Sequence, residues 1–134
     1  MTRAPVHLAQ ASYQHCCEAP EFFEAFYTEF FARCPTARPM FAHTDFKRQL
    51  GMVKHGLGLL LNFSQHSETE PNILTRLSKR HGRGDLDVHP SLYPYFVDAL
   101  IATARKFDAQ FNDETEAAWR DALAKGIAYM GSKY

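Results

Sequence analysis

Apolar residues recur at three- and four-residue intervals along most of the chain, and this spacing constrains the fold more than any other feature. Residues so spaced lie on one face of an α-helix, which must bury that face against another element. Runs that alternate polar and apolar residues, typical of β-strands, are almost absent, and β-branched residues are few. The pattern therefore predicts an all-α protein with about six helices.

Prolines, glycines and capping residues divide the chain into the expected helices. Pro20 suits the first position of a helix, Pro35 ends that helix, and Gly82 ends the fourth one. Thr44 or Asp45 can cap the third helix, and Asn112 or Asp113 can cap the last one, because their side-chain oxygens accept hydrogen bonds from free backbone N–H groups. The expected helices cover residues 6–17, 20–34, 45–61, 71–81, 92–107 and 113–130, with a turn region over 34–41.

The length and charge of the chain limit its function. Its 134 residues suit one domain, so we expect a single domain over residues 1–134. Lys plus Arg (15) and Asp plus Glu (15) cancel, which leaves no net field to favour nucleic acid or an anionic membrane. No apolar run reaches the roughly 18 residues of a membrane span. Cys16, Cys17 and Cys34 lack metal-site spacing, which favours reduced thiols in the cytoplasm.

Three polar residues interrupt the apolar faces of three expected helices. Tyr27 follows the helical spacing of Phe23 and Phe30, and Gln49 and His81 lie in line with the apolar residues of their own helices. A buried polar group without a partner costs roughly 1–3 kcal/mol. An iron porphyrin with a bound diatomic gas would be a partner for all three side chains.

The three side chains differ in what they could do at such a group. Haem iron is commonly held by one imidazole nitrogen, which leaves the opposite axial position open to a gas, and His81 could supply that nitrogen. Hydrogen bonds from Tyr27 and Gln49 to O2, at about 0.5–1.5 kcal/mol each, would slow its loss by roughly one to two powers of ten.

Each of these residues alone also has an ordinary structural explanation. Tyr27 could be a core residue whose hydroxyl bonds a backbone carbonyl, and Gln49 could lie at a helix margin. His81 could simply favour the negative end of a helix dipole. The combination of the three side chains is what favours a functional site.

Several segments resemble bacterial globins. The stretch from Phe26 to Phe41 resembles the segment from the second helix to the following turn in that family; it reads FYTEFFARCPTARPMF. Two further stretches are similar to the distal helix and the proximal-histidine segment; they read RQLGMVKHGLGLLL and LSKRHGRGDLDVHPSLY. The pair Ala118 and Trp119 also matches. Over roughly residues 20–130 the chain is similar to bacterial single-domain globins, flavohaemoglobin globin modules and globin-coupled sensors.

The resemblance implies a globin fold of about six to eight helices around a haem b. It makes His81 the iron ligand, and it makes Tyr27 and Gln49 the distal pair that binds the gas. It places Phe41 on the porphyrin face and Val53 over the iron. The residues expected to bind the cofactor are Phe41, Val53, His81, Tyr93 and Phe96.

Two alternatives concern the distal side. Met52 competes with Gln49 as the distal residue, although it lies off the apolar face of its helix. His55 could be a second iron ligand, but it falls on the opposite side of the helix from Val53. Flavohaemoglobins also carry an acidic residue late in the last helix, where this chain ends at Tyr134. This difference weakens a prediction of peroxidase or fast NO dioxygenase activity.

Three functions therefore remain in order of preference. The first is reversible binding of O2, CO or NO at a five-coordinate haem iron, for oxygen transport or gas sensing in the cytoplasm. The second is a haem enzyme, with NO dioxygenase, peroxidase or nitrite reductase activity supported by an external reductase. The third is a haem-free helical regulatory module. The sequence is also compatible with a homodimer.

Overall fold

The computed structural model describes residues 5–134, which form six α-helices and three short 3-10 helices without any strand. The prediction of an all-α protein is confirmed. The α-helices are α1 (Pro5–Cys17), α2 (Phe22–Arg33), α3 (Phe46–Asn62), α4 (Thr75–His81), α5 (Tyr93–Phe107) and α6 (Asp113–Ser132). The 3-10 helices are η1 (Pro35–Phe41), η2 (Phe63–Gln65) and η3 (Pro90–Leu92).

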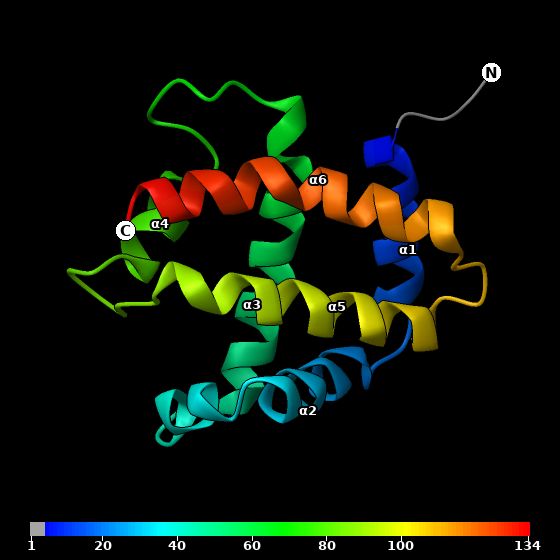
Figure 1. Ribbon diagram of the computed structural model, residues 1–134, viewed down its shortest axis with the longest axis horizontal. Coiled ribbons are helices and arrows are strands. Elements are labelled where there is room, and N and C mark those ends of the chain that lie inside the picture. Colours follow the sequence, from blue (N-terminus) through cyan, green and yellow to red (C-terminus); the bar gives the residue numbers. More distant parts are fainter. Residues whose placement is uncertain (1–4) are drawn as a thin grey trace.

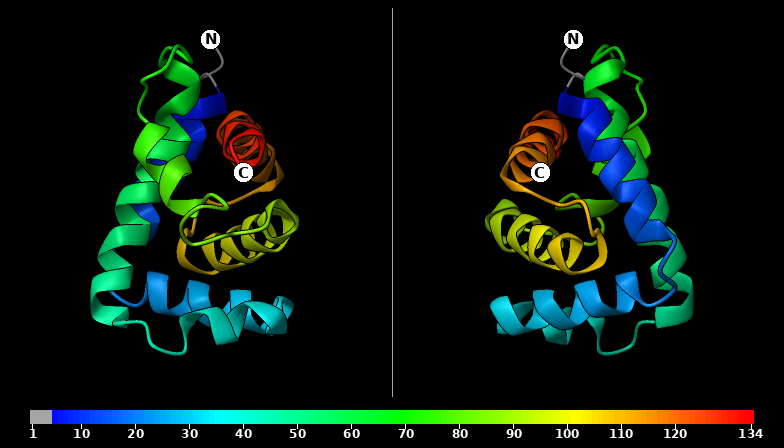
Figure 2. Two further views of the ribbon diagram at one scale, coloured as in Figure 1. Left: turned by 90° about the vertical axis from the view of Figure 1, so that its left-hand side faces the viewer. Right: turned by 90° about the vertical axis from the view of Figure 1, so that its right-hand side faces the viewer.

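α1 and α3 run steeply across the direction of α5 and α6 (Figure 1). α5 and α6 run side by side in front of α3, and α2 lies below α5. Figure 2 shows α1 and α3 on one side of the molecule and α5 and α6 on the other, with α2 closing the lower end. α1 packs mainly against α6, and α2 packs mainly against α5. No helix among the described residues is long and apolar enough to cross a membrane.

Aromatic contacts hold the two main helix pairs together. Between α2 and α5, the ring of Phe26 meets that of Phe96 edge-on, with centroids 5.2 Å apart. Between α1 and α6, Tyr13 meets Trp119 in the same way at 6.0 Å. Phe26 and Trp119 are fully buried. Burial of such a side chain contributes about 1.5–3 kcal/mol or more, so these contacts account for much of the core.

Two glycine contacts fix α3 between α6 and α4. A Cβ added at Gly126 of α6 would lie only 2.8 Å from Leu60 Cδ2, so the two helices approach closely because position 126 has no side chain. On α3, a Cβ at Gly56 would meet Leu77 Cδ1 of α4 at 3.8 Å. α4 therefore packs against α3 one turn before His81.

Burial along α3 increases from its first turn to its last. Leu57 and Leu60 are buried, Gln49 and Val53 are partly buried, and Phe46 is 36% exposed. The helical spacing places all five on one face of α3. The gradient arises because α6 crosses the second half of α3, whereas the first half extends beyond that crossing toward α2.

Two of the predicted helix caps are present. The Asp45 carboxylate accepts from the backbone N–H of Arg48 at the start of α3, at 3.4 Å. The Asn112 side chain accepts from the N–H of Thr115 at the start of α6, at 2.9 Å. Each cap satisfies a backbone donor that has no partner within its helix.

Two helix starts were predicted too early. The second helix begins at Phe22, because the N–H of Phe22 bonds the Ala19 carbonyl in a turn that includes Pro20. The fourth begins at Thr75, not at residue 71, because the Asn72 side chain accepts from the N–H of Leu74 in a local turn. Asparagine competes in this way with the first turn of a helix. The expected turn over residues 34–41 contains η1.

Candidate functional site

α2 and α3 bring the side chains of Tyr27 and Gln49 together. The Gln49 amide Nε2 donates to the Tyr27 hydroxyl oxygen at 2.9 Å. Tyr27 is only 5% exposed. Burial raises the pKa of the Tyr27 phenol, more than the hydrogen bond from Gln49 lowers it, so the phenol keeps its proton at neutral pH. Because the Tyr27 oxygen already accepts a hydrogen bond from Gln49, the phenol proton is free to donate to another group. No described residue accepts a hydrogen bond from it.

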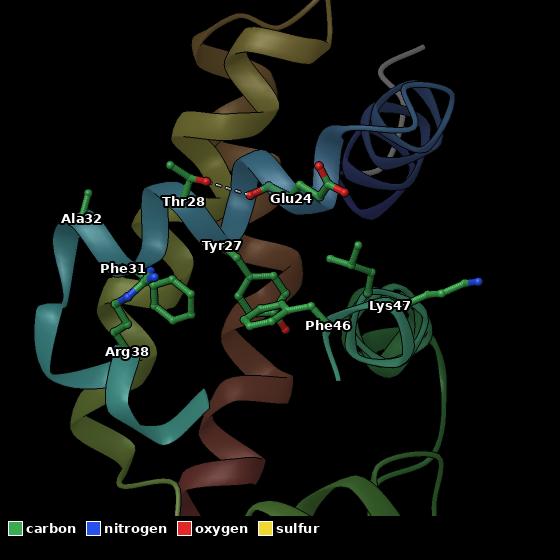
Figure 3. Close-up of a pocket in the computed structure, with 9 residues that line it drawn as sticks. Glu24, Tyr27, Thr28, Phe31, Ala32, Arg38, Phe46 and Lys47 are labelled. Carbon is green, nitrogen blue, oxygen red and sulfur yellow. Dashed lines mark hydrogen bonds between the residues drawn. The ribbon is translucent and has the colours of Figure 1, made fainter. Parts of the chain in front are cut away.

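Aromatic rings surround Tyr27 and fix its orientation. Its ring centroid lies 5.8 Å from that of Phe31, 5.6 Å from that of Phe41 and 5.5 Å from that of Phe46. Phe41 is the last residue of η1 and is partly buried. The rings of Tyr27, Phe31 and Phe46 border a surface pocket between α2 and α3 (Figure 3). Phe41 and Phe46 meet the Tyr27 ring edge-to-face, which favours one ring orientation over others.

His81 ends α4 and has one ring nitrogen already engaged. Its Nδ1 lies 2.9 Å from the carbonyl oxygen of Leu77. A carbonyl can only accept, so Nδ1 carries the proton and Nε2 keeps a lone pair. Burial lowers the pKa of His81 more than the Leu77 carbonyl raises it, which favours the neutral imidazole. A neutral ring oriented by its second nitrogen is the form that binds metals.

The loop after His81 folds back onto the end of α4. The N–H of Val88 donates to the His81 carbonyl at 2.8 Å. Asp87 adopts a left-handed backbone conformation with φ of 54°, which aspartate tolerates better than most residues. From the chain end that follows α6, the hydroxyl of Tyr134 bonds Asp87, and the Arg83 guanidinium lies over the Tyr134 ring at 4.7 Å from its centroid. The last residues of the chain thus help to hold the loop beside His81.

The other residues predicted to bind a cofactor lie on α3 and α5. Val53 is partly buried one turn after Gln49. Phe96 is partly buried and packs against α2. Tyr93 is 9% exposed, burial raises its pKa, and it lines a pocket of about 380 Å³ between α5 and α6. Among the described residues, no hydrogen bond joins the Tyr93 hydroxyl to His81.

The two distal alternatives occupy exposed positions on α3. Met52 is 47% exposed, and the side chain of His55 is also exposed. Gln49 is the residue of this helix that bonds Tyr27. The geometry therefore joins Tyr27 with Gln49 and leaves Met52 outside that pair.

Sequence reasoning did not identify three residues that support these groups. The Leu77 carbonyl orients His81, and its position four residues earlier on a helix could have indicated this. Phe46 packs on Tyr27, and its place three residues before Gln49 was the available signal. Tyr134 is distant in sequence from the loop that it contacts, so no local pattern could have identified it.

The donor set fits a haem group. A neutral imidazole ends α4, and a phenol and an amide face each other from α2 and α3. The Gly56–Leu77 contact joins the helices that carry Gln49 and His81. Imidazole ligands to the iron and polar groups near the bound gas are the means by which helical haem proteins control their iron.

Comparison with known proteins identifies the family. The globin family model matches residues 24–130, and the chain belongs to the globin family. Its structure is similar to the crystal structure of protein PA3967 from Pseudomonas aeruginosa PAO1, described as structurally highly homologous to a human hemoglobin. The two share 33% sequence identity over 98% of each chain, with a TM-score of 0.90. No curated protein matches the chain. Membership of the globin family implies haem binding.

Proposed function

We propose that the chain holds haem b through Nε2 of His81 and reversibly binds O2, and also CO and NO, on the side of Tyr27 and Gln49. Bound haem would supply an iron able to bind a diatomic gas. The observation that carries the proposal is the hydrogen bond from Gln49 to Tyr27, since it leaves the phenol proton free for a further acceptor.

The role of His81 follows from its tautomer. The Leu77 carbonyl takes the Nδ1 proton, so Nε2 is the nitrogen left for iron. The lowered pKa of the buried ring favours the neutral form that a metal requires. His81 is therefore the proposed iron ligand, and Phe41, Val53, Tyr93 and Phe96 are the proposed lining of the haem site.

Tyr27 and Gln49 are the proposed donors to the gas. Each can give about 0.5–1.5 kcal/mol to a polar ligand, more if that ligand carries charge. O2 accepts hydrogen bonds well and CO accepts them weakly, so the pair should favour retention of O2.

The cysteines Cys16, Cys17 and Cys34 are free thiols, which supports a reducing, cytoplasmic location.

The visible absorption spectrum of the purified protein tests the proposal. It is recorded on the ferric protein, on the protein reduced under nitrogen, and after exposure to CO and O2. We expect a five-coordinate ferrous spectrum that shifts with both gases. A six-coordinate ferrous spectrum would indicate an internal second ligand such as His55, and no uptake of added hemin would favour a haem-free regulatory module.

Two variants test which histidine binds the haem iron. His81→Ala should lose haem while its far-ultraviolet circular dichroism stays that of the parent protein. His55→Ala, which changes an exposed histidine of α3, should keep both haem and the gas-induced shifts. Haem retention by the His81→Ala variant would contradict the assignment of the iron ligand.

The same polar pair also favours a second candidate function, that of a haem enzyme. Donors that polarise O2 can also promote its reaction with NO, so NO dioxygenase activity with an external reductase is the alternative. NO consumption over many turnovers in the presence of a reductase would support the enzyme. A single turnover that stops when the reduced protein is used up would support a carrier or sensor.

A further inference from the structure

A second candidate site lies beside Tyr27. The pocket between α2, η1 and α3 has a volume of about 660 Å³. Its apolar wall consists of Tyr27, Phe31, Phe46 and Leu50. Pockets of about 300–1,000 Å³ with apolar and aromatic walls are typical of small-molecule sites. The size and lining therefore suit a small ligand with an apolar body.

Charged side chains stand at the rim of this pocket. Arg38 comes from η1, Lys47 from α3 and Glu24 from α2. The Arg38 guanidinium lies over the Phe31 ring at 5.4 Å from its centroid, whereas Lys47 extends away from the rings (Figure 3). None of the three forms an ion pair among the described residues. Arg38 thus presents an uncompensated cation directly beside the apolar wall.

We propose that this pocket binds a small amphipathic carboxylate. Its apolar body would lie against Phe31, Phe46 and Leu50, and its carboxylate would bond the Arg38 guanidinium. A guanidinium presents parallel N–H donors that match a carboxylate, and such charge-assisted bonds are among the stronger ones. The two cations outnumber the single acid of the rim, so the charge of the pocket favours an anion over a cation.

The pocket is connected to the gas-binding pair through one side chain. Tyr27 contributes to the pocket wall, and its hydroxyl accepts from Gln49. A ligand in the pocket should therefore change the O2 dissociation rate. This consequence alone rests on the proposed function, whereas the binding of a carboxylate does not.

Calorimetric titration of the purified protein with octanoate tests the site. We expect saturable binding at one site. Arg38→Gln should weaken it about tenfold or more, because the charge-assisted hydrogen bonds are lost. Arg38→Lys should recover part of the affinity, since it restores the charge without the planar donors. Lys125→Gln, at an exposed position of α6, is the matched control and should bind octanoate like the parent protein.

Two further measurements locate the ligand and test its charge. Ala32 is exposed and lines the pocket, so Ala32→Phe should fill the space and abolish binding while Arg38 is retained. 1-Octanol, which has no charge, should bind about tenfold more weakly than octanoate. Equal binding of the two would overturn the assignment of a carboxylate.

Other outcomes would overturn the site itself. These are the absence of saturable binding, or octanoate binding that survives both Arg38→Gln and Ala32→Phe. Because heat is measured without any gas, failure of this site is distinguishable from failure of haem and O2 binding.

Discussion

The amide Nε2 of Gln49 on α3 lies 2.9 Å from the hydroxyl oxygen of Tyr27 on α2, and the amide is the donor. This contact links two helices that the sequence separates by the whole η1 segment. Since the tyrosine oxygen accepts, the phenol proton points to whatever acceptor shares the site. The pair is thus organised to donate before any ligand enters.

Tyr27→Phe tests that arrangement. Removal of the hydroxyl should speed O2 dissociation about tenfold or more, from the loss of roughly 1.5 kcal/mol, and should leave CO dissociation nearly unchanged. Rapid-mixing kinetics on the ferrous protein measures both rates. Tyr95→Phe, at a tyrosine of α5 that is 47% exposed, is the matched control and should change neither rate. An O2 rate that Tyr27→Phe leaves unaltered would remove Tyr27 from gas binding.

Gly126→Val tests the crossing of α3 and α6. The added side chain would begin 2.8 Å from Leu60 Cδ2 and 3.5 Å from the Leu60 carbonyl oxygen, and Leu60 is only 6% exposed. We expect the free energy of unfolding to fall by about 1–3 kcal/mol, because overpacking outweighs the small gain in helix propensity. Urea unfolding measures the change. Gly58→Val, where nothing lies within 4 Å of an added Cβ, should not destabilise the protein.

Much of the fold could be predicted because the signals are local. The caps at Asp45 and Asn112 depend on side chains next to the helix that they start, and both were predicted. The burial gradient along α3 was not, because it depends on where α6 crosses the helix. Helical spacing shows which residues share a face but not which part of that face a neighbour covers.

The candidate site, too, could be predicted from the sequence only in part. Tyr27 and Gln49 could be selected because each interrupts an apolar face, yet their direct hydrogen bond depends on how α2 and α3 pack. The pocket beside Tyr27 depends on Arg38 of η1, a segment that was expected only to turn. Residues that meet through tertiary packing leave no spacing in the sequence to detect.

Asp108→Asn tests a buried carboxylate at the end of α5. Asp108 is 4% exposed, and its carboxylate contacts Nδ1 of His15 at 3.0 Å and accepts from the N–H of Gln110 at 3.1 Å. Burial alone raises the pKa of Asp108, but Ser12, the Gln110 N–H and His15 together lower it below its ordinary value. The folded state therefore binds this proton less readily than the unfolded state does.

The sign of the pH effect follows from that lowered pKa. The contribution of Asp108 to stability is present above the unfolded pKa of about 3.9 and is lost as the pH falls through the lower folded value. Asp108→Asn should cost about 1–3 kcal/mol at pH 7, and the difference from the parent protein should shrink below about pH 4. Urea unfolding across this range measures it. Asp121→Asn, at an exposed position of α6, should show no such difference.

Tyr134→Phe tests whether the chain end after α6 holds the loop beside His81. The change removes the hydrogen bond to Asp87 and keeps the ring under Arg83. Because this hydrogen bond lies near the surface, its loss should act locally, and amide exchange over residues 82–90 should speed roughly fivefold. Because this loop supports the proposed iron ligand, transfer of haem to a scavenger protein should also accelerate.

Tyr129→Phe is the matched control for that measurement. It removes a comparable exposed hydrogen bond, from Tyr129 of α6 to Glu70 at 3.1 Å. Exchange over residues 82–90 and haem transfer should both stay at the parent rates in this variant. If Tyr134→Phe likewise changes neither rate, the backbone bonds from Val88 to His81 and from Arg83 to Tyr134 hold the loop without the Tyr134 hydroxyl. The tyrosine would then pack on the loop without positioning the histidine.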